Sequence, residues 1–355
     1  MVWVRQLAIR DFRNIKDLTL ELHTGLNVFY GRNAQGKTSL LEAVGVLARG
    51  RSFRTEDAPS MIRRGASSLL ARAHAGEVPA SSRLEVEIEP GRRTLRLDGR
   101  EVAAREYQGR LEVVVYSTDR LRTIRGSMRE RRQFLDRSAS ALWPSYRTEL
   151  RTFERLLAQR NAVLASRGRD LEAWTERFID SGARLRSRRA AYAARLSAAL
   201  AEGFRPDVET YEVRARESPP NEEASRRTLQ EEIVRTSTQE RAAGRTLAGP
   251  HRDQVALLLN GRDAADGASS GQARSLLLAL ALACLRVYHE ETGQSAVALL
   301  DDLDSELDEE RAGAICTEVA LRGQALVTTA HAGWAESLRA QGRIYNVAGG
   351  EVRCA

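Results

Sequence analysis

The stretch Gly31-Arg32-Asn33-Ala34-Gln35-Gly36-Lys37-Thr38 decides the fold prediction, because it fits the pattern GxxxxGK[ST]. It stands between an apolar run, Leu26 to Tyr30, and a helical pattern from Lys37 to Ala48. The backbone N–H groups of such a loop, together with the positive end of the following helix, bind phosphate oxygens. We therefore expect all eight residues to contact a nucleotide, with Lys37 at the β- and γ-phosphates and the Thr38 hydroxyl on Mg²⁺.

Lysine is nearly absent elsewhere, since Lys16 and Lys37 are the only lysines among 55 basic residues. A chain that otherwise uses arginine but keeps lysine in this loop indicates a position that suits a compact ammonium rather than a planar guanidinium. A chance match in a glycine-rich turn is the alternative. The strand pattern before the loop and the helical pattern after it argue against that alternative.

A second apolar run, Ala296 to Leu300, ends in two carboxylates, Asp301 and Asp302. This is the form of a Walker B segment, in which the first acid helps to hold Mg²⁺ and the second orients or deprotonates the attacking water. Two acids could also form a solvated turn. A P-loop needs such a partner, however, and no other predicted strand ends in an acidic pair. We therefore expect Asp301 to bind Mg²⁺ with Thr38, and Asp302 to act as the catalytic base.

Three further motifs stand in a characteristic order around the acidic pair. Ser270-Gly271-Gln272 precedes a helix, Ser305 to Asp308 follows the acids, and His331 follows another apolar strand. In this order they resemble the signature, D-loop and switch histidine of ABC-type ATPases. A lone histidine would more often be a surface residue. The resemblance implies nucleotide contacts by Ser270, Gly271, Gln272, Ser305 and Asp308, and a catalytic role for His331 beside Lys37.

Positive charge is concentrated between residues 120 and 200, where nineteen arginines face eight acidic residues in a chain of net charge +7. Apolar residues at three- and four-residue intervals predict long helices there. The arginines are either solvated helix faces or a surface for nucleic-acid phosphates. One cluster has no interleaved acid, and we therefore take it as the candidate DNA-binding surface: Arg184, Arg186, Arg188 and Arg189.

The remaining patterns divide the chain into a head and an insertion. Alternation over residues 83–102, with Pro90-Gly91 and Asp98-Gly99 turns, predicts antiparallel hairpins. Strands that alternate with helices beyond residue 255 predict a parallel sheet. We expect an α/β head, a mixed sheet with the P-loop plus an antiparallel β lobe, over residues 1–118 and 237–355. An arginine-rich α-helical second domain, residues 119–236, is inserted into it.

Several classes of protein are disfavoured. Three widely spaced cysteines suit neither a disulfide framework nor a zinc site. Arg5 and Arg10 interrupt the apolar N-terminal stretch, so it is not a typical signal peptide. The longest apolar run, Leu276 to Leu285, is shorter than the ~20 residues of a membrane helix. We expect a cytoplasmic protein without a membrane partner.

The long insertion before Ser270 distinguishes the chain from transporter ATPases and resembles the structural-maintenance-of-chromosomes (SMC) branch of ABC-type proteins. Three stretches narrow the resemblance to the RecF family over nearly the whole chain: Leu7 to Asn14, Ala248 to Asp253, and Leu300 to Asp308. Ala34 and Ser39 stand where that family usually has glycine and asparagine. The segment Tyr116 to Asp119 contains no glutamine, so no Q-loop residue is assigned.

The resemblance implies a slow, DNA-stimulated ATPase that binds ATP and Mg²⁺ and dimerises when ATP is bound. It further implies binding to single-stranded, double-stranded or junction DNA. With RecO and RecR, such a protein helps to load RecA at gapped DNA during repair and replication restart. Two alternatives remain: the energising subunit of a membrane transporter, which leaves the basic insertion unexplained, and a small-molecule kinase, which leaves Ser270 and residues 305–308 unexplained.

Overall fold

The structure, a computed structural model, describes residues 3–76, 81–204, 209–215, 219, 221–305, 307 and 309–355. Its contacts divide the chain into two compact units. Unit 1 comprises residues 1–120 and 288–355, and unit 2 comprises residues 121–287. The sequence-based division placed the second boundary at 236/237. The contacts instead group residues 237–287 with the helices, because a strand from this stretch pairs with a strand that follows the helical segment.

Unit 1 contains two six-stranded sheets. Its elements before the insertion are β1 (Val4–Phe12), β2 (Ile15–Glu21), β3 (Leu26–Tyr30), α1 (Lys37–Arg49), η1 (Ala58–Met61), β4 (Leu69–Ala75), β5 (Ser82–Glu89), β6 (Arg92–Leu97), β7 (Arg100–Glu101), α2 (Ala104–Tyr107), β8 (Val113–Tyr116) and η2 (Thr118–Arg120). Those after it are β12 (Val297–Leu300), η3 (Leu303–Ser305), α10 (Glu309–Arg322), β13 (Ala325–Thr329), α11 (Ala332–Ser337), β14 (Gly342–Ala348) and β15 (Glu351–Cys354).

One sheet has the order β15-β14-β3-β13-β12-β8, and all its neighbours are parallel except β15, which pairs antiparallel with β14. Its inner strands β12 and β13 are buried at every position. Continuous apolar runs are what a parallel sheet covered on both faces requires. Because parallel strands end at one edge, β3 and β12 bring the P-loop and the acidic pair to the same edge of the sheet.

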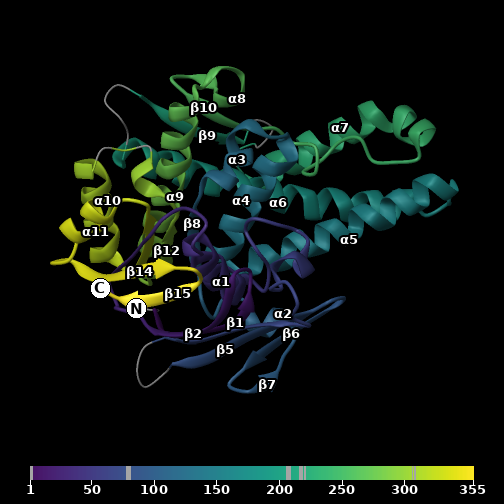
Figure 1. Cartoon of the computed structure of the whole chain (residues 1–355). Helices are drawn as coiled ribbons and strands as arrows, with labels where there is room; N and C mark the ends of the chain where they lie inside the picture. Colours follow the sequence, from purple (N-terminus) through teal and green to yellow (C-terminus); the bar gives the residue numbers. More distant parts are fainter. Residues whose placement is uncertain are drawn as a thin grey trace. The chain divides into compact units, whose positions relative to one another are not determined.

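The other sheet is antiparallel, with the order β2-β1-β4-β5-β6-β7. Helix α1 contacts β1, β4 and β5 of this sheet and β8, β12 and β13 of the parallel sheet, so it lies between the two (Figure 1). This placement explains why α1 is buried almost all round rather than along one stripe. The structure thus confirms the predicted mixed sheet with a P-loop and an antiparallel β lobe.

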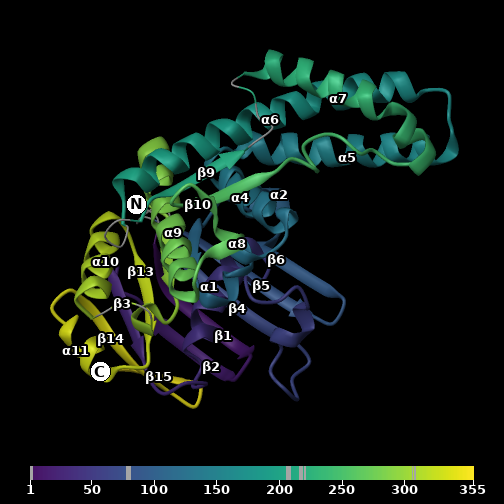
Figure 2. The ribbon, with the colours of Figure 1, turned by 90° about the horizontal axis from the view of Figure 1, so that it is seen from above.

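Unit 2 is mainly helical and includes a three-stranded antiparallel sheet of order β11-β10-β9. Its elements are α3 (Arg122–Arg125), α4 (Met128–Leu142), α5 (Pro144–Ser166), α6 (Leu171–Glu202), β9 (Tyr211–Ala215), α7 (Glu222–Ala243), β10 (Val255–Leu259), β11 (Arg262–Asp263), α8 (Ala264–Gly267) and α9 (Ser270–Thr292), which continues across the unit boundary. Helix α6 lies alongside both α5 and α7 (Figures 1 and 2). The inserted helical domain is therefore present.

Helix α9 is the one helix among the described residues that is long and apolar enough to cross a membrane, by length and composition alone. More than half of its most apolar window is buried inside the protein. Core helices have the same character.

Candidate nucleotide-binding site

The P-loop connects β3 to α1, as the sequence predicted, and two glycines give it its shape. Gly36 immediately precedes α1 with φ 110°, a conformation that disfavours other residues. A Cβ atom there would lie 2.9 Å from the Asn14 side chain, which is too close for a van der Waals contact. At Gly31 a Cβ atom would lie 2.2 Å from the Val347 carbonyl oxygen. The loop is therefore packed tightly against neighbouring backbone and side chains.

The C-terminal hairpin β14–β15 supports the same loop, and sequence reasoning missed it. The Gly349 backbone N–H donates to the Gln35 side-chain oxygen at 2.6 Å, and the Gly350 N–H donates to the Gln35 carbonyl at 3.0 Å. Together with the close approach of Val347 to Gly31, these bonds fix both ends of the loop. The Gly349-Gly350 turn was the available signal, because paired glycines between alternating segments favour a hairpin.

The Lys37 side chain turns back onto the loop. Its Nζ donates to the Gly31 carbonyl at 2.7 Å and to the Arg32 carbonyl at 3.2 Å, and the residue is only 5% exposed. These two hydrogen bonds hold the ammonium group against the P-loop, whose backbone N–H groups bind phosphate oxygens in proteins of this kind. The arrangement suits a phosphate-binding lysine.

Thr38 and Asp301 meet across 263 residues of sequence, because Thr38 Oγ1 donates to Asp301 Oδ1 at 3.0 Å. Asp301 also accepts from Thr328 Oγ1 at 2.7 Å and from Ser117 Oγ at 3.3 Å. Burial raises the pKa of Asp301, and these hydroxyl donors oppose that rise. The site thus offers a hydroxyl and a carboxylate, an all-oxygen donor set that fits Mg²⁺.

Ser117 follows β8 in the segment where no Q-loop glutamine could be assigned. Strand β8 pairs with β12 in parallel, with Tyr116 opposite Leu300, so residue 117 necessarily lies beside residue 301. The sequence carried no motif for this contact. Only the pairing of the two strands places the Ser117 hydroxyl on the Walker B carboxylate.

Asp302 follows directly and adopts φ 50°, which is uncommon for a residue other than glycine. Its backbone N–H donates to Thr328 Oγ1 at 2.8 Å. Burial raises the pKa of its carboxyl, and the positive charge of Lys37 partly offsets the rise. A carboxyl group with a raised pKa is better suited to accept a proton than one of ordinary acidity.

His331 belongs to a small network behind the acidic pair. The Thr329 hydroxyl donates to Asp304 Oδ2, and His331 Nδ1 lies 3.2 Å from the same oxygen. The His331 backbone N–H donates to the Thr329 hydroxyl at 2.8 Å. The imidazole itself is 62% exposed, whereas the Asp304 side chain is only 4% exposed. In the D-loop motif, Asp308 and the Ser305 side chain lie outside the described residues.

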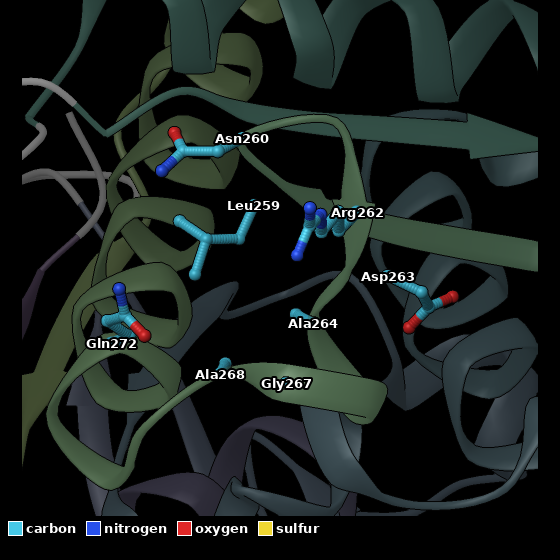
Figure 3. A pocket seen from close by; sticks show the side chains of 8 residues that line it. All are labelled: Leu259, Asn260, Arg262, Asp263, Ala264, Gly267, Ala268 and Gln272. Atoms are coloured by element: carbon cyan, nitrogen blue, oxygen red, sulfur yellow. The ribbon is translucent and has the colours of Figure 1, made fainter.

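The signature motif lies in unit 2, at the start of α9. The Ser269 N–H donates to the Gln272 side-chain oxygen at 2.9 Å, and the Gln272 N–H donates to Ser269 Oγ at 3.2 Å. This reciprocal pair is a capping box, and it leaves the Ser270 hydroxyl on the exposed first turn. A cavity of about 410 Å³ beside this turn is lined by Leu259, Asn260, Arg262, Asp263, Ala264, Gly267, Ala268 and Gln272 (Figure 3).

The candidate arginine cluster does not form one phosphate-binding surface. No acid is interleaved with these arginines in the sequence, but acids from distant segments neutralise two of them. Arg186 and Arg189 are buried at 1% and 2% exposure. Acids distant in sequence pair with them, Asp253 at 2.5 Å with Arg186 and Asp136 at 3.0 Å with Arg189.

The other two arginines of the cluster face outward to different degrees. Arg188 donates to Glu149 at 2.7 Å and stacks over the Trp143 ring at 5.0 Å. Of the four arginines, Arg184 alone is exposed. Helical periodicity separates these positions onto different faces of α6, so adjacency in sequence did not make a surface.

The comparisons with known proteins match nearly the whole chain. The RecF/RecN/SMC N-terminal domain family matches residues 3–353. The chain is 37% identical to the DNA replication and repair protein RecF of Symbiobacterium thermophilum, covering 92% of this chain and 91% of that protein. It is 35% identical to the protein of the same name from Moorella thermoacetica, covering 93% and 90%.

Solved structures give the same answer at the level of the fold. The recombination mediator protein RecF with ATP, from the RecFOR pathway, has a TM-score of 0.90 at 26% identity, covering 100% of this chain and 99% of that one. The Smc head domain of Pyrococcus furiosus, at 15% identity, has a TM-score of 0.61 and covers 100% and 96%. The predicted ABC-type ATPase head with an SMC-like fold is therefore confirmed.

Proposed function

Because the chain belongs to the RecF/RecN/SMC N-terminal domain family, we propose that it is an ATP-dependent, DNA-binding recombination mediator. One observation carries the proposal from the structure itself: Thr38 and Asp301 are hydrogen-bonded at 3.0 Å, which joins the P-loop to the Walker B strand. The solved relative with ATP supports the nucleotide, and the names of the curated relatives support the role in DNA replication and repair.

In this proposal, the residues at the edge of the parallel sheet carry out the hydrolysis step. The P-loop backbone and Lys37 bind the β- and γ-phosphates, and Asp302 accepts the proton of the water that attacks the γ-phosphorus. The P–O bond to the β-phosphate oxygen breaks, and ADP and phosphate leave. Thr38 and Asp301 would hold Mg²⁺, which when bound neutralises charge on the phosphates. His331, whose Nδ1 lies 3.2 Å from Asp304 Oδ2, would act as the switch histidine.

The finer parts of the proposal concern assembly. ATP binding joins two copies, with Ser270 of each copy contacting the γ-phosphate held by Lys37 of the other. Hydrolysis is slow, DNA stimulates it, and it ends the joined state. In the cytoplasm the ATP-bound dimer works with RecO and RecR to place RecA on gapped DNA. We assign no residues to the DNA-contacting surface, because two arginines of the candidate cluster, Arg186 and Arg189, are buried.

The test measures ATP hydrolysis with and without DNA. We expect stimulation by DNA in the wild type, no nucleotide binding in Lys37→Met, and retained binding with slow turnover in Asp302→Asn. Lys16→Met is the matched control, because Lys16 is exposed on β2 and is the only other lysine. Indifference to DNA would favour the transporter subunit, and phosphate on a metabolite would favour the kinase. ATP bound normally by Lys37→Met would overturn the P-loop assignment.

The proposed contact of Ser270 with the nucleotide of the other copy can be tested separately. Ser270→Arg puts a long side chain where a short hydroxyl closes on phosphate. We expect nearly normal ATP binding by the monomer, with loss of dimerisation and of hydrolysis. Sedimentation with a non-hydrolysable ATP analogue decides the matter, since a variant that still dimerises would mean that the signature does not act between copies.

A further inference from the structure

An arginine, Arg125, lies beside the signature serine, Ser270. Arg125 Nη2 donates to the Ala268 carbonyl at 3.2 Å and to the Ser270 hydroxyl at 3.4 Å. Both acceptors are neutral, and both distances exceed the roughly 2.7–2.9 Å of charge-assisted hydrogen bonds. No carboxylate in the described part of the chain bonds to this guanidinium, and Arg125 is exposed. Its positive charge is therefore available at the signature turn.

Another arginine of the same short helix α3, Arg122, differs from Arg125 because it has an acidic partner. Arg122, one turn earlier on α3, lies 4.0 Å from Glu130, so an acid partly neutralises it. Gly126 follows α3 with extended backbone, and a Cβ atom there would lie 2.1 Å from a Glu130 carboxylate oxygen and 2.3 Å from the Arg122 carbonyl oxygen. Glu130 in turn completes a capping box with Ser127 at the start of α4. The segment that follows Arg125 is therefore closely packed.

A buried arginine, Arg131, bonds both to the helix that carries Arg125 and to the segment that precedes the signature. Arg131 is fully buried and donates to both Asp263 oxygens, at 2.7 and 2.8 Å. It also donates to the Ile124 carbonyl at 2.8 Å, next to Arg125. Asp263 in turn accepts from the Ala265 N–H at 3.0 Å and so begins α8, the helix that leads to the signature. One guanidinium thus holds both the element that carries Arg125 and the element that carries the signature turn.

We propose that Arg125 contacts the γ-phosphate of the ATP bound by a second copy of this chain, beside Ser270. This inference rests on the proposed function, in which the signature completes the site of the other copy. An exposed guanidinium with five N–H donors and only neutral acceptors gains most from a dense anion. The terminal phosphate of a nucleoside triphosphate is such an anion, and the preformed position of Arg125 lowers the cost of ordering it.

The experiment compares Arg125→Ala, Arg125→Lys and the matched control Arg122→Ala by sedimentation with a non-hydrolysable ATP analogue. ATP affinity of each monomer is measured separately at a protein concentration below dimerisation. We expect Arg125→Ala to weaken analogue-dependent dimerisation about tenfold for each site, hence about a hundredfold for a two-site dimer. Monomer affinity should stay within about twofold of the wild type. Arg125→Lys should recover part of the loss, and Arg122→Ala should dimerise normally.

The possible outcomes distinguish failure of the Arg125 inference from failure of the proposed function. Dimerisation of Arg125→Ala at wild-type strength overturns the inference while leaving the proposed function standing. Equal losses in Arg122→Ala and Arg125→Ala, or a loss of monomer ATP affinity, assign Arg125 to folding or to its own copy's site and also overturn the inference. A wild type that does not dimerise with the analogue refutes the two-copy switch of the proposed function itself.

Discussion

Replacing Arg186 with Met tests whether the arginines of α6 stabilise the fold or bind DNA. Arg186 Nε donates to Asp253 at 3.0 and 2.9 Å, and Nη2 donates to Asp253 at 2.5 Å and to Glu232 at 2.8 Å. The Arg186 and Asp253 side chains are 1% and 2% exposed. Methionine retains much of the apolar stem but removes every one of these donors. The variant therefore leaves the Asp253 carboxylate buried with Arg189 at 3.7 Å as its remaining cation.

The expected loss of stability is large. Removing one partner of a buried ion pair costs about 3–5 kcal/mol when the other charge stays buried without compensation. Arg189, at 3.7 Å, offsets only part of this cost for Asp253. Whole domains are stable by about 5–15 kcal/mol, so this is a substantial fraction. With a urea m-value of about 2 kcal/mol per molar, the midpoint of unfolding should fall by about 2 M.

Urea unfolding followed by tryptophan fluorescence measures this shift, because Trp143 and Trp174 both belong to unit 2. Arg184→Met is the matched control, since Arg184 is exposed on the same helix, and its midpoint should stay near that of the wild type. Adding Asp253→Leu to Arg186→Met should recover most of the loss, because no unpaired charge remains buried. A wild-type midpoint combined with weakened DNA binding in Arg186→Met would refute the structural role.

Three further predictions concern backbone geometry and pH. Gly31→Ala should weaken ATP binding and cost roughly 1–3 kcal/mol of stability, since its Cβ would lie 2.2 Å from the Val347 carbonyl oxygen. Gly333→Ala, with open space around its Cβ, serves as its control, and equal effects would contradict the packing argument. Ala34 has φ 63°, so Ala34→Gly should stabilise unit 1 by roughly 0.5–1 kcal/mol, and a lower thermal midpoint would contradict this. Burial lowers the pKa of His251 from 6.5 to about 4, so its contribution to stability is present above pH 6.5 and is lost as pH falls towards 4. That loss reaches roughly 3 kcal/mol, and His251→Gln should flatten this part of the pH–stability curve in thermal unfolding.

The contact between the P-loop and the acidic pair could be predicted because the motifs that define both segments are local. A P-loop needs glycines, one lysine and one hydroxyl within eight residues, and the flanking strand and helix follow from side-chain periodicity. The acidic pair likewise ends a continuous apolar run. Helix α7 begins at Glu222, where Asn221 caps it, and ends before Gly244 at φ 64°, so its bounds also follow from local signals.

Contacts between distant segments were decided only by the tertiary structure. Asp136 and Asp253 lie 53 and 67 residues from the arginines they neutralise, so no local pattern could show that Arg189 and Arg186 are buried. Ser117 meets Asp301 only because β8 pairs with β12 in one particular register. A sequence records the period and the backbone preference of each segment, whereas the partner of a buried charge depends on which segments pack together.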